Sequence, residues 1–162
     1  MNRLRRELNH LLEVLVEFLP GGTSLRVAVH KTRGVHIKGR VFISRRVILE
    51  TKFPEKIWIG SNVVIGIGTT VLAHHDTVED MSNANVVIGD NVYIGPHCVI
   101  LPGVTIGENS VVAAGSVVNK SVRANRLVRG NPCSTVAEIT TPLGLNGEMV
   151  SFMRGLRNFQ KK

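Results

Sequence analysis

Two adjacent histidines followed by an aspartate, His74-His75-Asp76, are the residues of this chain best suited to acid–base chemistry. Histidine changes its protonation state near neutral pH, so it can take a proton from one group and return it to another. A neighbouring carboxylate can orient an imidazole, and Asp76, Glu79 and Asp80 are candidates for that role. The alternative for each acid is a solvated loop residue, and the histidine pair could instead anchor a loop or lie on the surface.

A six-residue repeat surrounds these residues. An ordinary helix has a period of about 3.6 residues and a strand a period of two, so neither requires an aliphatic residue at every sixth position. That spacing nevertheless persists over three stretches of the chain, and a fixed period of this kind indicates a repeat architecture. The aliphatic positions are Ile37, Ile43 and Leu49; Ile59, Ile65 and Val71; and Ile88, Ile94, Ile100, Ile106, Val112 and Val118.

The period predicts a parallel β-solenoid. Six residues make a short strand and a turn, and one such unit cannot bury its apolar side alone. Stacked coils would pair their backbones and align the aliphatic side chains inward, with caps needed at both ends. The residues four positions after these aliphatics are usually small or branched and should also face inward: Val41, Val47, Val63, Thr69, Val92, Cys98, Val104, Ser110 and Ser116.

The register of the repeat locates two insertions. Grouped in threes, the aliphatic residues begin coils at Ile37, Ile59, Ile88 and Ile106. The last step is 18 residues, whereas the first two steps are longer by four and by eleven residues. The smaller excess lies near 51–56. The larger is the stretch 77–87, directly after Asp76, and we expect it to leave the solenoid as a loop of the kind that often carries function.

The ends of the chain lie outside the repeat. Residues 3–19 predict an amphipathic helix with one leucine stripe, ended by Pro20-Gly21-Gly22. We expect it to pack on the domain or on a neighbouring subunit. Contact with a membrane surface is the alternative, because Arg3, Arg5 and Arg6 are basic. Residues 147–160 predict a short second helix. The expected division is a helix over 1–22, a β-helix over 23–136 and a tail over 137–162.

Composition limits the function classes. The chain has 162 residues, 4% aromatic residues and a formal net charge of +8, which suits a phosphate-bearing ligand such as coenzyme A. No aromatic residues interleave with the cations, so we expect no nucleic-acid binding. Cys98 and Cys133 have neither CxxC nor zinc-ligand spacing, which favours reduced thiols in a cytoplasmic protein. The N-terminal apolar run has no cleavage site and is too short to span a bilayer.

Three segments give the chain a resemblance to a known family. PEKIWIGSNVVIGIGTTVLAH (54–74), VVIGDNVYIGPHCVILPGVTIGENSVVAAGSVVNKSV (86–122) and RGNP (129–132) resemble the hexapeptide-repeat acyltransferases, most of all the sugar O-acetyltransferases of polysaccharide, lipopolysaccharide and maltose type. The resemblance covers about 35–136. It implies an all-β fold, a left-handed parallel β-helix, here with an N-terminal helix and a short C-terminal helical tail. It also implies a homotrimer with active sites in the clefts between subunits.

The resemblance also implies roles for the histidines. The family's catalytic histidine sits where an inserted loop leaves the solenoid, in a context like Val71-Leu72-Ala73-His74. His74 is therefore the expected general base and His75 the alternative. His75 lies four residues after Val71, a position that points inward elsewhere, whereas His74 lies nearer the corner. His97, three residues after Ile94, should also lie outward near a corner, more as a surface residue than as part of a cleft.

The stretch AAGSVVNK (113–120) matches the family's coenzyme-binding segment. Gly115 would allow close approach of the pantetheine arm, and the small side chains of Ala114 and Ser116 leave room for it. Three cations, Lys120, Arg126 and Arg129, could meet the coenzyme's phosphates or could be solvated corner residues. The chain departs from the family pattern around GNP, where it has Arg129 before and Cys133-Ser134 after.

These observations predict a coenzyme A-dependent acetyltransferase that acts on a sugar hydroxyl, with acetyl-CoA as donor and no metal. An amine acceptor would use the same base, and a longer acyl donor remains open. A non-catalytic β-helix scaffold is one alternative. Another is a metal hydratase like the γ-class carbonic anhydrases, which place two ligand histidines five positions apart; here Pro102 stands five residues after His97.

Overall fold

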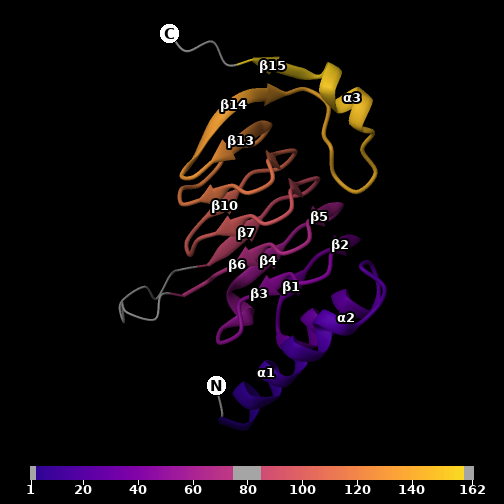
Figure 1. The fold of residues 1–162 in the computed structure, drawn as a ribbon, viewed down its shortest axis with the longest axis vertical. Helices are drawn as coiled ribbons and strands as arrows, with labels where there is room; N and C mark the ends of the chain where they lie inside the picture. The colour runs from indigo at the N-terminus through magenta and orange to yellow at the C-terminus, as the bar shows by residue number, and fades with distance from the viewer. Residues whose placement is uncertain (1–2, 75–84, 159–162) are drawn as a thin grey trace.

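The computed structural model describes residues 3–74 and 85–158. Short parallel strands stack between a helical N-terminal end and a strand-and-helix C-terminal end (Figure 1). The elements in chain order are α1 (Arg3–Phe18), α2 (Leu25–Arg33), β1 (His36–Ile37), β2 (Val41–Ile43), β3 (Ile48–Leu49), the 3-10 turn η1 (Pro54–Lys56), β4 (Ile57–Ile59), β5 (Val63–Ile65), β6 (Thr70–Val71), β7 (Val86–Ile88), β8 (Tyr93–Ile94), β9 (Val99–Ile100), β10 (Thr105–Ile106), β11 (Val111–Val112), β12 (Val117–Val118), β13 (Arg126–Gly130), β14 (Cys133–Ile139), α3 (Met149–Arg154) and β15 (Leu156–Asn158).

The repeat forms three parallel sheets. The first has the order β1-β4-β7-β10, and the third has the order β12-β9-β6-β3. The second contains β2, β5, β8 and β11 and continues into β13, β14 and β15. Each repeat strand therefore pairs with the strand three further along the chain, so the chain visits the three sheets in turn, one coil upon another.

The predicted register is confirmed. Ile37 pairs with Ile59, Ile59 with Ile88, and Ile88 with Ile106. The aliphatic positions from Ile43 to Val118 are at most 2% exposed, as are most of the positions four residues later. Cys98, predicted as a core residue, is fully buried, and burial raises the pKa of its thiol. The interior is thus built from columns of small branched side chains, which compensates for the lack of aromatic residues.

An asparagine ladder supports the corner between the first and second sheets. Asn62, Asn91, Asn109 and Asn125 occupy equivalent corner positions with φ between 57° and 60°. Their side chains bond in series: Asn62 Nδ2 donates to Asn91 Oδ1 at 2.7 Å, and the next two steps are each 3.0 Å. Asparagine tolerates this left-handed conformation better than most residues, so one residue type satisfies both the turn and the ladder.

Asn91→Ala should therefore destabilise the fold by about 1–3 kcal/mol, because it removes two ladder bonds and places alanine at positive φ. Asn119→Ala is the matched control, since Asn119 is exposed and is not among the residues with positive φ. Urea unfolding of both variants measures the difference. Equal stabilities for the two variants would show that the ladder contributes nothing.

The N-terminal end differs from the prediction. α1 matches the expected helix, but a second helix, α2, occupies residues assigned to the β-helix. Its buried face carries Arg26, Val27, His30 and Arg33, so it has no apolar stripe by which a sequence pattern could reveal it. α1 also packs through an unexpected face: Asn9, Glu13 and Val16 are buried, whereas the predicted stripe is largely exposed, with Leu4 81% exposed.

Buried His30 makes the stability of this end depend on pH. His30 is fully buried, and Arg33 Nη1 donates to its Nδ1 at 3.0 Å. Burial, helped by the charges of Arg33 and Arg26, lowers the pKa of His30 from 6.5 to about 3. Below pH 6.5 His30 therefore binds a proton in the unfolded chain but not in the folded chain. The free energy of unfolding should fall as the pH drops through this range.

Between pH 7 and pH 5 this loss should be about 2 kcal/mol. His30→Gln, which keeps an acceptor for Arg33, should abolish the slope over that range, whereas His10→Gln on the exposed side of α1 should leave it. Urea unfolding at several pH values measures it. An unchanged slope in His30→Gln would contradict the assignment.

The C-terminal end is more regular than predicted. Residues 126–139 form the antiparallel pair β13–β14, with Gly130-Asn131-Pro132 leading through the turn, and β15 adds a third strand. The predicted helix over 147–160 is shorter: α3 ends at Arg154, and the chain returns to the sheet as β15. Strand pairing prevails here because the edge of β14 offers unpaired backbone groups.

The larger insertion is also shorter at its end than predicted. Val86 and Val87, expected within the loop 77–87, lie in β7 and pair with Ile57 and Trp58. The ladder with β4 extends the strand two residues ahead of the inward Ile88. Residues 75–84 lie outside the described residues. Among the described helices none is both long and apolar enough to cross a membrane.

Candidate active site

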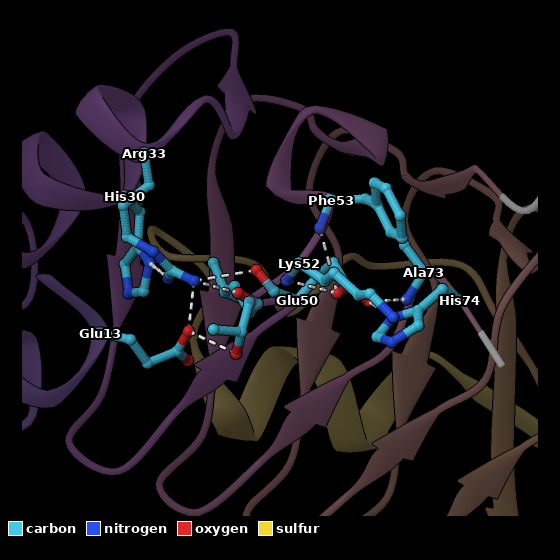
Figure 2. Close-up of polar contacts among 10 residues, drawn as sticks. Glu13, His30, Arg33, Glu50, Lys52, Phe53, Ala73 and His74 are labelled. Atoms are coloured by element: carbon cyan, nitrogen blue, oxygen red, sulfur yellow. Dashed lines mark hydrogen bonds and ion pairs between the residues drawn. The ribbon is translucent and has the colours of Figure 1, made fainter. Parts of the chain in front are cut away.

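His74 stands where the chain leaves the third sheet. It follows β6 and the buried Ala73, and its side chain is 20% exposed, so the imidazole is held by the fold yet reachable. Its Nδ1 lies 2.7 Å from Oε2 of Glu50, which comes from the coil below (Figure 2). The expected base therefore has a carboxylate partner, although not one of the three predicted acids.

Glu50 is bound from several sides. Its side chain is fully buried; Oε2 also accepts the N–H of Ala73 at 2.7 Å, and Oε1 accepts the N–H groups of Lys52 at 2.8 Å and Phe53 at 3.2 Å. Burial alone would raise the pKa of Glu50, but the bonds from His74, Ala73 and Lys52 outweigh it, so the pKa lies below 4.5. Glu50 is an ionised acceptor at neutral pH.

An ionised Glu50 determines the tautomer of His74. A carboxylate can only accept, so Nδ1 of the imidazole must carry the hydrogen that it donates. The neutral ring then keeps its lone pair on Nε2, the nitrogen that can receive a proton. This arrangement of a base held by a buried carboxylate is the one used by histidine general bases.

The smaller insertion forms a wall beside the imidazole. The ring of Phe53 meets His74 edge-on, with centroids 5.5 Å apart and an interplanar angle of 76° (Figure 2). Lys52 and Lys56 place their ammonium groups 5.9 and 4.9 Å from the centre of the Phe53 ring. The excess residues predicted near 51–56 thus add an aromatic contact to the histidine and two cations beside that aromatic ring.

Of the other predicted acid–base residues, the structure describes only His97. His75, Asp76, Glu79 and Asp80 lie outside the described residues. His97 is exposed, with φ of 54°, at the corner between β8 of the second sheet and β9 of the third. His74 follows the third sheet, so the two histidines belong to different corners.

The predicted coenzyme segment lies at the same corner as His97. Ala114 and Gly115 are exposed between β11 and β12, and a Cβ added to Gly115 would meet no atom within 4 Å. Ser116 is buried: its Oγ donates to the carbonyl of Ala113 at 2.6 Å and accepts the N–H of Gly130 at 3.2 Å. One chain therefore presents open backbone at this corner and the histidine at the next.

Of the predicted cations, Lys120 shares the corner that carries His74, whereas Arg126 begins β13 of the second sheet, next to the asparagine ladder. Lys120 follows β12 of the third sheet as His74 follows β6, two coils away. Lys120 and Arg126 line a pocket of about 340 Å³ together with Arg123. Arg126 Nη1 pairs with Glu138 at 2.9 Å, whereas Arg129 is exposed on β13. The pocket is basic, with part of its charge balanced by Glu138.

A larger groove of about 590 Å³ lies elsewhere, over the outer face of the first sheet. His36 and Trp58 stack there with ring centroids 3.8 Å apart, and His74 is not among the lining residues. Among the described residues that line this groove, no histidine contacts a carboxylate as His74 does. We therefore place the candidate active site at the corner of His74, although the groove is larger.

Glu50 was not predicted, although two sequence signals mark it. It is an acid directly after the inward Leu49, and it directly precedes the smaller insertion. In the register it lies one coil below Leu72, next to the segment that ends at His74: its N–H donates to Val71 O at 2.9 Å. Acids near His74 in sequence are the first candidates for its partner, whereas a solenoid also brings together residues that are one coil apart.

Comparison with known proteins supports the resemblance. The family model of the bacterial transferase hexapeptide (six repeats) matches residues 85–120. YvoF of Bacillus subtilis (strain 168), whose name marks it as a candidate acetyltransferase, is 46% identical over 44 residues, which span 27% of this chain and 26% of that relative. The matched segment is therefore about a quarter of the curated relative's length.

Solved structures extend the similarity to most of the chain. The hexapeptide-repeat acetyltransferase VCA0836 of Vibrio cholerae is 26% identical, with a TM-score of 0.60 over 83% of this chain and 90% of its own; it has also been solved with acetyl coenzyme A. A galactoside acetyltransferase in complex with coenzyme A shares the fold at 24% identity, with a TM-score of 0.60 over 83% of this chain and 80% of its own. The chain is thus similar to hexapeptide-repeat acetyltransferases.

Proposed function

We propose that this protein is a coenzyme A-dependent acetyltransferase that acts on a hydroxyl of a sugar or saccharide, with His74 as general base. The observation that carries the proposal is the 2.7 Å contact between His74 Nδ1 and the ionised, buried Glu50. The similarity to VCA0836, solved with acetyl coenzyme A, supports the donor. The acceptor class comes from the resemblance to sugar O-acetyltransferases.

The reaction needs no covalent enzyme intermediate. Nε2 of His74 takes the proton of the acceptor hydroxyl as that oxygen attacks the thioester carbonyl carbon. A carbon–oxygen bond forms and the carbon–sulfur bond breaks, so the coenzyme leaves as a thiolate. The imidazolium, stabilised by Glu50, returns the proton to that sulfur. The edge-on contact with Phe53 limits the rotation of the His74 imidazole.

Two sets of residues are proposed to bind the coenzyme. The open backbone at Ala114 and Gly115 suits the pantetheine arm, and Lys120, Arg126 and Arg129 suit the phosphates. Gly115 and His74 lie at different corners of one chain, so a cleft between subunits is the arrangement that unites them. We therefore propose a homotrimer of left-handed β-helices with shared sites, located in the cytoplasm, where acetyl-CoA is available.

Calorimetric titration with coenzyme A tests the proposal without knowledge of the acceptor. Saturable binding by the purified protein is expected, weakened at least about tenfold by Gly115→Val, whose side chain would crowd the arm at a φ of 71°. No binding by the wild type would favour a scaffold. Stoichiometric metal in the purified protein would instead favour the hydratase.

A further inference from the structure

We propose that Arg33 is a positioning residue of the site: it holds the main chain of Glu50 and, through Glu50, the imidazole of His74. The proposal rests on the proposed function of His74. It makes the N-terminal helices part of the active site's support, in addition to their place at the end of the coils.

Arg33 reaches the site from α2. It is fully buried, and its Nη2 contacts the carboxylate of Glu13 on α1. The same nitrogen donates to the carbonyl oxygen of Leu49 at 3.0 Å and to that of Glu50 at 2.8 Å. Figure 2 shows the resulting series of contacts from Glu13 through Arg33 and Glu50 to His74.

The position of β3 explains why these carbonyls need Arg33. β3 is an edge strand of the third sheet. The N–H groups of Ile48 and Glu50 donate to the next coil, to Thr69 O at 3.0 Å and Val71 O at 2.9 Å. No described strand lies beyond β3 on its other side, and buried carbonyls without partners are costly. Arg33 supplies the donors that a further strand would otherwise give.

Glu50 is also the last residue before the chain leaves the coil. Its main chain is held on one side by the bond to Val71 and on the other by Arg33. Beyond it, Thr51 begins the smaller insertion, and its hydroxyl donates to Glu13 Oε2 at 2.8 Å. Glu13 therefore fixes both the guanidinium and the residue that follows Glu50, so the two helices jointly restrain the direction of the Glu50 side chain.

A carboxylate that must select one imidazole tautomer needs accurate placement, because small displacements weaken a charge-assisted hydrogen bond strongly. Lysine at position 33 would keep a charge for Glu13 but has a single nitrogen, whereas the guanidinium uses Nη2 for Glu13 and the two carbonyls and Nη1 for His30 Nδ1. We therefore expect Arg33→Lys to loosen Glu50 without removing its charge.

A double-mutant cycle tests the inference in the full-length protein. Arg33→Lys should lower kcat about tenfold and change the KM for acetyl-CoA less than twofold, and it should have no further effect on kcat in a Glu50→Gln background. Arg26→Lys is the matched control: Arg26 is buried on the same helix, but its Nε and Nη1 have no partner in the described structure. Its kcat should stay within twofold of wild type.

The ¹⁵N chemical shifts of the His74 ring give a second readout that needs no turnover. The wild type should show the Nδ1–H tautomer, and Arg33→Lys should shift the ring toward the mixture seen in Glu50→Gln. If Arg33→Lys does not fold, Glu13→Gln, which weakens the anchor of the guanidinium, should produce the same shift.

The inference is overturned if Arg33→Lys costs the same factor in both backgrounds, or if the tautomer of His74 is unchanged in a folded variant. Failure of the proposed function looks different. In that case the wild type turns over no acceptor, while the ring shifts still report whether Arg33 acts on His74 through Glu50.

Discussion

His74→Ala is expected to lower kcat for acetyl transfer by about 10²- to 10⁴-fold, the usual contribution of a general base. Glu50 cannot replace it in the described structure, because its carboxylate is buried, ionised and already bound to three backbone N–H groups. The acceptor hydroxyl would then have to attack with its proton still attached.

Thiol release from acetyl-CoA measures this loss, and coenzyme A titration checks that binding is intact. His36→Ala is the matched control, because His36 is an exposed histidine that lines the separate groove over the first sheet, and its kcat should match that of the wild type. His75→Ala should be measured alongside. The assignment fails if His74→Ala keeps more than a tenth of wild-type kcat or if His75→Ala causes the larger loss.

Glu50→Gln is expected to lower kcat by about 10- to 100-fold with little change in the KM for acetyl-CoA. The amide keeps the shape of the carboxylate but can present either a donor or an acceptor to Nδ1, so the ring is no longer confined to one tautomer. The imidazolium formed during the reaction also loses the charge that stabilises it.

Glu55→Gln is the control for this substitution, because Glu55 is an exposed acid of the same insertion.

Glu50→Gln should also reduce the loss of stability in acid. The pKa of Glu50 is lower in the folded than in the unfolded chain, so its ionised form stabilises the fold above pH 4.5 and that contribution is lost as the pH falls through the folded pKa. Unchanged kcat in Glu50→Gln would exclude Glu50 from the site.

The fold of the repeat could be predicted because its signal is local and periodic. The six-residue spacing of Ile88, Ile94 and Ile100 predicts inward columns, and the lengths of the steps predict which coils carry insertions; the strand pairing confirms both. α2 could not be predicted in the same way. Its buried face is polar, and the partners of Arg33 are main-chain carbonyls, which leave no trace in a pattern of side chains.

Only some residues of the candidate site could be proposed from the sequence. The resemblance to a family points to His74, and the insertion that follows Asp76 is consistent with a position at a corner. The acids nearest to His74 in sequence, Asp76, Glu79 and Asp80, lie outside the described residues, and the structure places Glu50, 24 residues earlier, against the ring. In a solenoid the spatial neighbours of a residue lie one coil earlier or later, so an acid in the equivalent segment of the preceding coil is the signal to seek.

The most direct test of the central claim is thiol release from acetyl-CoA by the wild-type protein, measured over sugars, amino sugars, nucleotide sugars and hydroxyl amino acids, with mass spectrometry of the product. The account predicts acceptor-dependent thiol release and an acetyl ester on a sugar hydroxyl, lost in His74→Ala. An acetyl amide as the product would correct the acceptor to an amine. Thiol release that is the same in wild type and His74→Ala, or none with any acceptor, would contradict an acetyltransferase that uses His74.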